Sequence, residues 1–339
     1  MIAGSDMSHA ATIRAGPRRT HAPETRGTTN KTSAPAAPPS WAALVPQLKP
    51  GTYADGLPFD EVRYLACKLV LRPNHFVSRQ SLFDFATLLI EPARKHGAKF
   101  SPRRSKKDPI RIREVLFVDT PDFRLYRNAF ILRRRILYED GFPIGDPEIV
   151  FKFRHRDLQT AAETDVRPQI LGDHRIKFKC QALPLKRQLG GVRILYSHNV
   201  QFPRSNVGDV DVLSMGTMVK IFPALERIKT DPDERIALVS DTIIEEVLQD
   251  VGTLDFGDKV QAPVTVALWR TRGEHRPLIG ELSFQIKFDE WKELSRDAMK
   301  RAEAFFIALQ FALRHWIALD ATKTGIVYRL NGNAPMSHE

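Results

Sequence analysis

The chain has 339 residues, and 51 Lys and Arg against 40 Asp and Glu give it a formal net charge of +11. Its 42% hydrophobic content is enough for a large core, which excludes a chain disordered throughout, and the positive excess favours anionic partners. No apolar run is long enough to span a membrane, no secretory signal is recognisable, and two cysteines are too few for a disulfide framework, so we expect a cytoplasmic protein with no membrane partner.

The first 40 residues contain no Leu, Val, Phe, Tyr or Trp and are rich in Ala, Pro, Ser, Thr and Arg. Such a segment cannot bury enough surface to offset the entropy lost on ordering, so we expect a disordered basic tail over residues 1–44. From Trp41 onward apolar residues recur, and no long linker interrupts them. We therefore expect one folded domain over residues 45–333 and a short tail over 334–339.

Strand signals, chiefly alternation of apolar and polar residues with period two, dominate this domain. In chain order the predicted strands are 64–71, 111–118, 130–136, 148–154, 163–167, 175–180, 192–198, 207–213, 264–269 and 281–288. Helices are predicted where a capping residue or apolar residues at helical spacing occur. They are 78–91, 241–251 and 295–319. The pattern predicts an α+β fold that is mostly antiparallel β.

Four of the predicted strands place two basic residues each on one face. The pairs are Arg111 and Arg113, Arg133 and Arg135, Lys152 and Arg154, and Lys177 and Lys179. Their opposite face is bulky and apolar, so it has to be covered, and the predicted helix over 295–319 is available to cover it. In an open sheet the basic face would be wet. If the sheet closes, which removes its exposed edges, that face becomes the lining of a channel.

A channel lined in this way would be self-repelling, since like charges about 4 Å apart cost roughly 4 kcal/mol at an effective dielectric near 20. Built-in carboxylates offer some relief: Glu163 and Asp165 alternate with Arg167, and Glu281 shares a face with Ser283. We expect the remainder from a polyanionic ligand, because Arg and Lys suit phosphate oxygens. The carboxylates either pair with the cations or hold Mg²⁺ or Mn²⁺ that bridges phosphates.

Several segments match a known pattern. Residues 117–135 read FVDTPDFRLYRNAFILRRR, and residues 148–154, 163–167 and 280–287 read EIVFKFR, ETDVR and GELSFQIK. These segments resemble the CYTH superfamily, the triphosphate tunnel metalloenzymes, with its Y-x-D-T-x-x-x-x-L and L-R-x-R motifs, its Lys-bearing strand, its E-x-E-x-R strand and its late acidic strand. The resemblance covers about residues 61–329, and its match is poorest over 170–260, a region longer than the family pattern.

The resemblance implies an eight-stranded antiparallel tunnel barrel with covering helices, which binds triphosphate-bearing compounds. Carried over position by position, it implies phosphate ligation by Lys68, Arg133, Arg135, Lys152, Arg154, Arg167 and Lys323. It implies coordination of Mg²⁺ or Mn²⁺ by Glu163, Asp165 and Glu281. Asp119 and Thr120, within the first motif, are expected to fix the turn between two strands, since Asp and Thr side chains bond nearby backbone groups.

The chain also departs from the family pattern. Where the first strand of the family reads E-x-E-x-K, this chain has Tyr64 and Ala66 in place of the two glutamates and keeps Lys68. On the late strand Ser283 follows Glu281 where a second glutamate belongs. Because a hard divalent ion is held by carboxylates, anion binding is better supported than metal-dependent hydrolysis.

Three functions remain open. The first is binding of a triphosphate or polyphosphate compound in a cationic tunnel, with metal-dependent hydrolysis as its enzymatic form. The second is a catalytically inactive sensor or scaffold for a phosphate ligand, which kept the cations and lost the carboxylates. The third is nucleic-acid binding through the basic tail and the cluster over residues 103–107. The sequence carries no signal for an oligomeric state.

Overall fold

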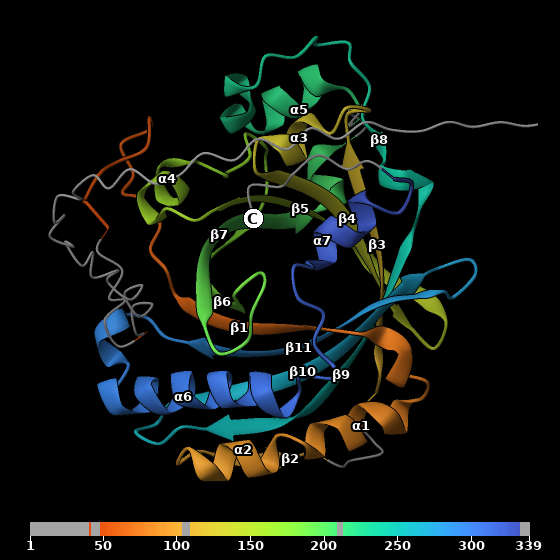
Figure 1. Ribbon diagram of the computed structural model, residues 1–339. Helices are drawn as coiled ribbons and strands as arrows, with labels where there is room; N and C mark the ends of the chain where they lie inside the picture. The colour runs from red at the N-terminus through yellow and green to blue at the C-terminus, as the bar shows by residue number, and fades with distance from the viewer. Residues whose placement is uncertain (1–40, 42–47, 104–108, 209–212, 333–339) are drawn as a thin grey trace, which may run out of the picture. The chain divides into compact units, whose positions relative to one another are not determined.

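The computed structural model describes Trp41 and residues 48–103, 109–208 and 213–332 (Figure 1). These residues belong to one compact unit, 38–339. Apart from Trp41, the expected tails lie outside the described residues, as does the basic cluster after Arg103. Trp41 is buried, with its ring 5.5 Å from that of Phe306. Among the described residues, none of the helices has the length and apolar character needed to cross a membrane.

Nine of the described strands close into a barrel. In the order of their pairing they are β9 (Ile244–Asp255), β10 (Gln261–Thr271), β11 (Pro277–Lys287), β1 (Tyr64–Leu71), β6 (Arg175–Pro184), β7 (Val192–Pro203), β5 (Phe142–His155), β4 (Phe130–Glu139) and β3 (Arg111–Asp119). Strand β3 pairs back with β9 and closes the ring. Strands β1 and β6 are parallel and the other neighbours antiparallel. The predicted closed barrel is confirmed, but it has nine strands and not eight.

Two short strands lie outside the ring: β2 (Lys99–Pro102) pairs with β9, and β8 (Ala237–Leu238) pairs with β3. The described helices are α1 (Arg79–Thr87), α2 (Ile90–Lys95), α3 (Arg124–Arg127), α4 (Leu158–Glu163), α5 (Met215–Ile221), α6 (Arg296–Ala312) and α7 (Lys323–Tyr328). Single turns of 3-10 helix are η1 (Pro73–His75), η2 (Arg204–Val207), η3 (Pro223–Arg227), η4 (Val239–Asp241) and η5 (Trp291–Glu293).

Helix α6 covers the apolar outer face of the barrel, as predicted for 295–319, although the helix ends earlier (Figure 1). It begins after Ser295, whose side chain caps the backbone N–H of Ala298. Its Phe305 and Phe306 rings lie 5.7 and 6.0 Å from the ring of Phe284 on β11. The predicted helix over 78–91 forms as two helices, α1 and α2. The outer face is therefore a packed core, and the polar face is turned inward.

The helix predicted over 241–251 is wrong, because this segment forms β9. Its apolar residues occur at helical spacing, yet the strand is buried on both faces, and such strands lose the simple alternation that marks a half-buried strand. Gly252 lies where the register with β10 shifts. A Cβ there would lie 2.5 Å from the carbonyl oxygen of Ser101, so the close approach of β2 requires glycine.

Of two further predicted strands, the one over 163–167 does not form, and the one over 207–213 lies largely outside the described residues. The segment 163–167 ends a helix, α4, because Asp157 caps its start and Ala161 and Ala162 are buried on one side of it. The segment 207–213 begins at the last residue of η2, and residues 209–212 lie outside those described. Within the long region 170–260, α5 and η3 cover the outer face of β5 and β7, with Phe222 stacked 4.0 Å from Phe151.

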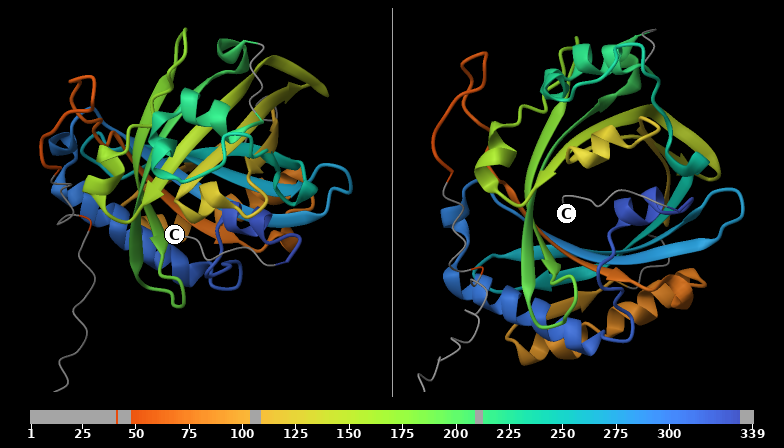
Figure 2. Two further views of the ribbon diagram at one scale, coloured as in Figure 1. Left: turned by 90° about the horizontal axis from the view of Figure 1, so that it is seen from above. Right: turned by 45° about the horizontal axis from the view of Figure 1, so that its top comes forward.

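Helices α3 and α7 lie at one side of the ring of strands (Figure 2). They contribute to an apolar cluster in which the Tyr126 and Tyr328 rings stack 4.1 Å apart, next to Phe117. Asp119 joins the two helices: its carboxylate accepts hydrogen bonds from the backbone N–H groups of Leu125 and Tyr126 and from the Tyr328 hydroxyl. The prediction that Asp119 fixes the turn is confirmed, and the same contacts anchor α7.

Candidate functional site

A cavity of about 420 Å³ lies inside the barrel. Among the described residues that line it, ten are basic and two are carboxylates. The basic residues are Lys68, Arg111, Arg113, Arg133, Arg135, Lys152, Arg154, Lys177, Lys179 and Lys323, and the carboxylates are Glu246 and Glu281. All four basic pairs expected from the alternation on β3, β4, β5 and β6 therefore face the interior. Lys68 comes from β1 and Lys323 from the first turn of α7.

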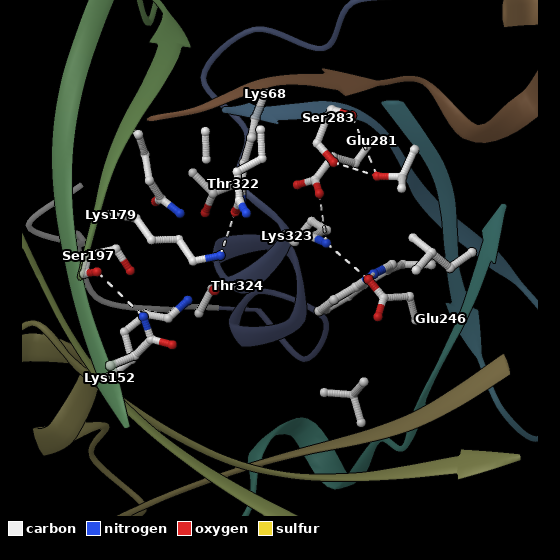
Figure 3. Close-up of a pocket in the computed structure, with 18 of the residues that line it drawn as sticks. Lys68, Lys152, Lys179, Ser197, Glu246, Glu281, Ser283, Thr322, Lys323 and Thr324 are labelled. Atoms are coloured by element: carbon white, nitrogen blue, oxygen red, sulfur yellow. Dashed lines mark hydrogen bonds and ion pairs between the residues drawn. The ribbon is translucent and has the colours of Figure 1, made fainter. Parts of the chain in front are cut away.

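The two carboxylates form what we call the acidic corner, which consists of Glu246, Glu281 and the ammonium of Lys323 (Figure 3). Lys323 Nζ lies 3.1 Å from Glu246 Oε1 and 3.0 Å from Glu281 Oε1. The indole N–H of Trp269 donates to Glu246 Oε1 at 2.8 Å, and Arg113 Nε lies 3.1 Å from Glu246 Oε2. Burial acts to raise the pKa of Glu246 and Glu281, but the nearby cations outweigh it and lower both pKa values. Both carboxylates are therefore ionised and compensated.

Five further basic residues of the lining form what we call the cationic wall: Lys68, Arg133, Lys152, Lys177 and Lys179. Lys68 lies on β1 beside β11 and feels the charge of Glu281, and the other four lie on β4, β5 and β6. The ammonium of Lys179 donates to Gln285 Oε1 at 2.7 Å. The side chain of Lys152 is buried, and among the described residues it forms no ion pair. The guanidinium Nε of Arg133 is buried with no hydrogen-bond partner in the described structure. In contrast to the acidic corner, this wall holds charge that the protein does not neutralise.

The pKa values of the lysines in the cationic wall reflect the same excess of positive charge. Burial is the largest cause that lowers the pKa of Lys179 to about 7 and the pKa values of Lys68 and Lys177 to about 8. Burial, followed by the charges of Arg133 and Arg154, lowers the pKa of Lys152 well below its ordinary range. An anion placed against the wall would reverse these shifts, because it favours the protonated amines.

Near the mouth of the cavity the cations have partners. Arg135 is paired with Glu148, which also lies 3.8 Å from Arg175, and Arg111 donates to Asp250 Oδ1 at 2.7 Å. Arg135 was expected to bind phosphate, and it does face the interior. Its pairing with Glu148 distinguishes it from Arg133, two residues earlier on the same strand.

Three expected site residues do not line the cavity: Glu163, Asp165 and Arg167. Because no strand forms over 163–167, Arg167 lies outside the barrel, where it bonds Asp165 at 2.6 Å and Asp55 at 2.8 Å. Glu163 is exposed at the end of α4 and accepts from Gln159 Nε2. Of the three expected metal ligands, Glu281 alone faces the cavity.

Glu246 and Trp269 were missed as site residues by the sequence analysis. Glu246 lies on the strand expected to be a helix, and it follows Glu245, which faces outward and bonds Arg270. Because two adjacent glutamates occupy opposite faces of the strand, this segment lacks the alternation of charged and apolar residues from which the basic pairs were predicted. Trp269 lies on a predicted strand, but an apolar residue in the alternation carries no sign that its N–H would bond an internal carboxylate.

The described residues of the cavity do not assemble a divalent-cation site of their own. Among the described residues, no group of three or more His, Cys, Asp and Glu side chains is placed to hold a metal ion. The two carboxylates of the acidic corner are bonded to Lys323, so the oxygens that Mg²⁺ or Mn²⁺ would need already have a cationic partner. The expected ligand set of Glu163, Asp165 and Glu281 is not assembled.

Solved structures with a likeness to this chain include HpAC1 from Hippeastrum, a proposed adenylyl cyclase described as having a dominant triphosphatase activity. It is 13% identical, with 81% of this chain and 98% of that chain covered, at a TM-score of 0.37. A protein from Bacillus halodurans described as a proposed adenylate cyclase is 11% identical over 78% of this chain and 96% of its own, at a TM-score of 0.36. One from Vibrio parahaemolyticus with the same description is 10% identical over 79% and 99%, at a TM-score of 0.30.

The closed barrel of this chain is consistent with the tunnel barrel that the sequence resemblance to the CYTH superfamily implies. No protein-family model and no curated protein matches the chain. Because the TM-scores are low, the function of the barrel has to be inferred from its own residues.

Proposed function

We propose that the barrel binds a small molecule that carries a triphosphate or a longer polyphosphate in its cationic cavity. The observation that carries this proposal is the uncompensated charge of the cationic wall. Lys152 and Arg133 are held inside the barrel without a carboxylate partner in the described structure. Burying a cation without a partner is costly, and an arrangement of several such cations is explained by an anion that binds among them.

The size and chemistry of the cavity suit such a ligand. A volume of about 420 Å³ falls within the range of roughly 300 to 1,000 Å³ that is usual for small-molecule sites. Lysine ammoniums and arginine guanidiniums from five strands reach it, and both groups form charge-assisted bonds with phosphate oxygens. Ser197, Asn199 and Thr265 add uncharged hydrogen-bonding groups to the lining.

Binding without turnover, as a sensor or scaffold, is favoured over metal-dependent hydrolysis by the acidic corner. Its carboxylates are bonded to Lys323 and Arg113 and are not arranged around a vacant metal position. Nucleic-acid binding stays a prediction from the sequence, since the tail and four of the five residues over 103–107 lie outside those described.

The proposal is tested by calorimetric titration of the full chain with tripolyphosphate in the presence of EDTA. Arg133→Gln, inside the barrel, is compared with Arg134→Gln, whose side chain faces outward 3.8 Å from Glu114. We expect binding by the wild type, a loss of about tenfold or more in affinity for Arg133→Gln, and no change for Arg134→Gln. Equal binding of tripolyphosphate and sulfate, or equal effects of the two variants, would overturn the proposal.

A phosphate-release assay with tripolyphosphate, nucleoside triphosphates and thiamine triphosphate, each with and without Mg²⁺, separates the two forms of the function. Binding without released phosphate supports the sensor or scaffold. Release that requires Mg²⁺ would support the metal-dependent triphosphatase.

A further inference from the structure

The ammonium of Lys323 occupies a position that is unusual for a lysine in a basic cavity. It lies within 3.1 Å of one carboxylate oxygen from each of Glu246 and Glu281 and 4.6 Å from the centre of the Trp269 ring (Figure 3). Only 17% of its side chain is exposed, against 7% and 8% for the two carboxylates. The positive charge of this ammonium is therefore compensated within the protein by two carboxylates and an aromatic face.

The backbone fixes this ammonium in place. Lys323 is the first residue of α7, and Thr322 caps the helix by accepting from the N–H of Gly325 at 3.0 Å. The far end of α7 is held by the bond from the Tyr328 hydroxyl to Asp119 and by the bond from the Ser240 hydroxyl to the carbonyl of Val327. An anchored helix therefore positions Lys323 at the acidic corner, with its side chain next to both carboxylates.

A divalent cation and this ammonium would compete for the same oxygens. Mg²⁺ needs oxygen ligands at about 2.0 to 2.1 Å. To bind Glu246 Oε1 and Glu281 Oε1 together it would have to enter the space between them, where the Nζ of Lys323 lies 3.1 and 3.0 Å from the two oxygens. A metal ion and the Lys323 ammonium placed between the same two carboxylates would repel each other strongly in a buried site. The corner can hold the lysine or the metal, but not both.

We propose that Lys323 is a built-in monovalent cation that fills the carboxylate pair of the cavity and excludes divalent metals from it. On the basis of the proposed function, the barrel then takes its polyphosphate in the metal-free form. The ligand's charges are met by the cationic wall alone, and a Mg²⁺ ion chelated by the ligand removes charge that the wall would otherwise bind. Mg²⁺ should therefore weaken binding, which is the opposite of its effect in a site that uses the metal as a bridge.

The first test uses Mn²⁺ alone, with no phosphate ligand, and counts bound Mn²⁺ by electron paramagnetic resonance. We expect no Mn²⁺ held by the acidic corner in the wild type and one bound Mn²⁺ in Lys323→Met, with an affinity on the order of tenfold or more above the wild type. Lys323→Arg keeps a cation and should resemble the wild type. Adding Glu281→Gln to Lys323→Met should abolish the new binding.

Two results would overturn the inference: a Mn²⁺ bound by the wild type that Glu281→Gln removes, or Lys323→Met that folds and binds no more Mn²⁺ than the wild type. If circular dichroism shows that Lys323→Met does not fold, the wild-type titration still decides between these outcomes.

A second test measures tripolyphosphate binding to the wild type as Mg²⁺ is increased. Weaker binding supports the inference, and stronger binding contradicts it. If tripolyphosphate does not bind at all, the proposed function fails, while the Mn²⁺ comparison still reports separately on the role of Lys323.

Discussion

The cationic wall and the acidic corner line one cavity and both contain charged side chains, yet their charges are handled in opposite ways (Figure 3). In the corner every charge has a partner. Glu246, for example, has three partners: Lys323, Trp269 and Arg113. On the wall, Lys152 is buried without an ion pair in the described structure. The corner is complete within the protein, whereas the wall is complete only with an anion. This difference separates the structural part of the cavity from its binding part.

The largest effect on stability is expected from a substitution in the acidic corner. Glu246→Gln removes the negative charge shared by Lys323 and Arg113, so Arg113 loses this counter-ion and Lys323 keeps only Glu281. We expect the free energy of unfolding to fall by about 3 to 5 kcal/mol, as measured by urea denaturation. Glu91→Gln breaks the exposed pair with Arg94 on α2 and should cost much less, because water screens a pair on the surface. Similar losses for the two variants would show that the corner is not a structural element.

A change of the cationic wall should act in the other direction. Lys152→Met removes a buried ammonium that has no partner in the described structure and keeps a side chain of similar length. We expect the unliganded protein to gain about 1 to 3 kcal/mol in stability while tripolyphosphate affinity falls, because the same charge destabilises the empty barrel and binds the ligand. Thermal unfolding with and without tripolyphosphate measures both effects. A variant less stable than the wild type would mean that Lys152 is compensated within the protein.

The wall was largely predictable from the sequence, and the reason is local. A strand fixes which face each side chain takes with a period of two, so pairs such as Arg133 and Arg135 share a face whatever the order of the strands. The apolar opposite face then decides that the basic face points inward once the sheet closes. Lys323 was placed by resemblance alone, yet α7 does bring it to the cavity.

The acidic corner was not predictable in the same way, because it depends on long-range pairing. Glu246 meets Lys323 only because β9 closes the barrel against β3 and α7 folds back against Asp119. The local pattern of β9 favoured a helix, which concealed both the ninth strand and its carboxylate. The segment 163–167 failed for the converse reason: five alternating residues are too few to outweigh a helix capped by Asp157.

A smaller effect is expected from pH, since ligand binding has to protonate part of the wall. The pKa of Lys179 is about 7 and those of Lys68 and Lys177 are about 8, so each amine is partly neutral near pH 8. A bound polyphosphate raises these pKa values, so binding should take up protons and weaken as pH rises above about 7. Calorimetry in buffers of different ionisation enthalpy measures the uptake. Proton release, or affinity that does not change between pH 7 and pH 9, contradicts the assignment.

The same shifts predict the pH dependence of the empty barrel. The unfolded chain has lysines of ordinary pKa near 10.5, so between about pH 7 and pH 10.5 it binds more protons than the folded state. From these lysines, the free energy of unfolding should therefore increase as pH rises through that window. Tripolyphosphate should flatten the increase, because it keeps the folded lysines protonated. Denaturation curves at several pH values, with and without ligand, check the sign.

The smallest effect is expected for Arg167→Gln, and it separates position in the fold from position in a motif. The resemblance makes Arg167 a phosphate ligand, but the structure places it outside the barrel with Asp55 and Asp165 and 4.3 Å from the ring of Tyr53. We expect unchanged tripolyphosphate affinity and a stability loss of about 1 kcal/mol from the half-exposed ion pairs. Arg133→Gln serves as the contrast. If the two variants weaken binding equally, the ligand is held by the motif positions and the inward face of the barrel does not define the site. If only Arg133→Gln weakens binding, a basic residue binds the ligand because its side chain points into the barrel.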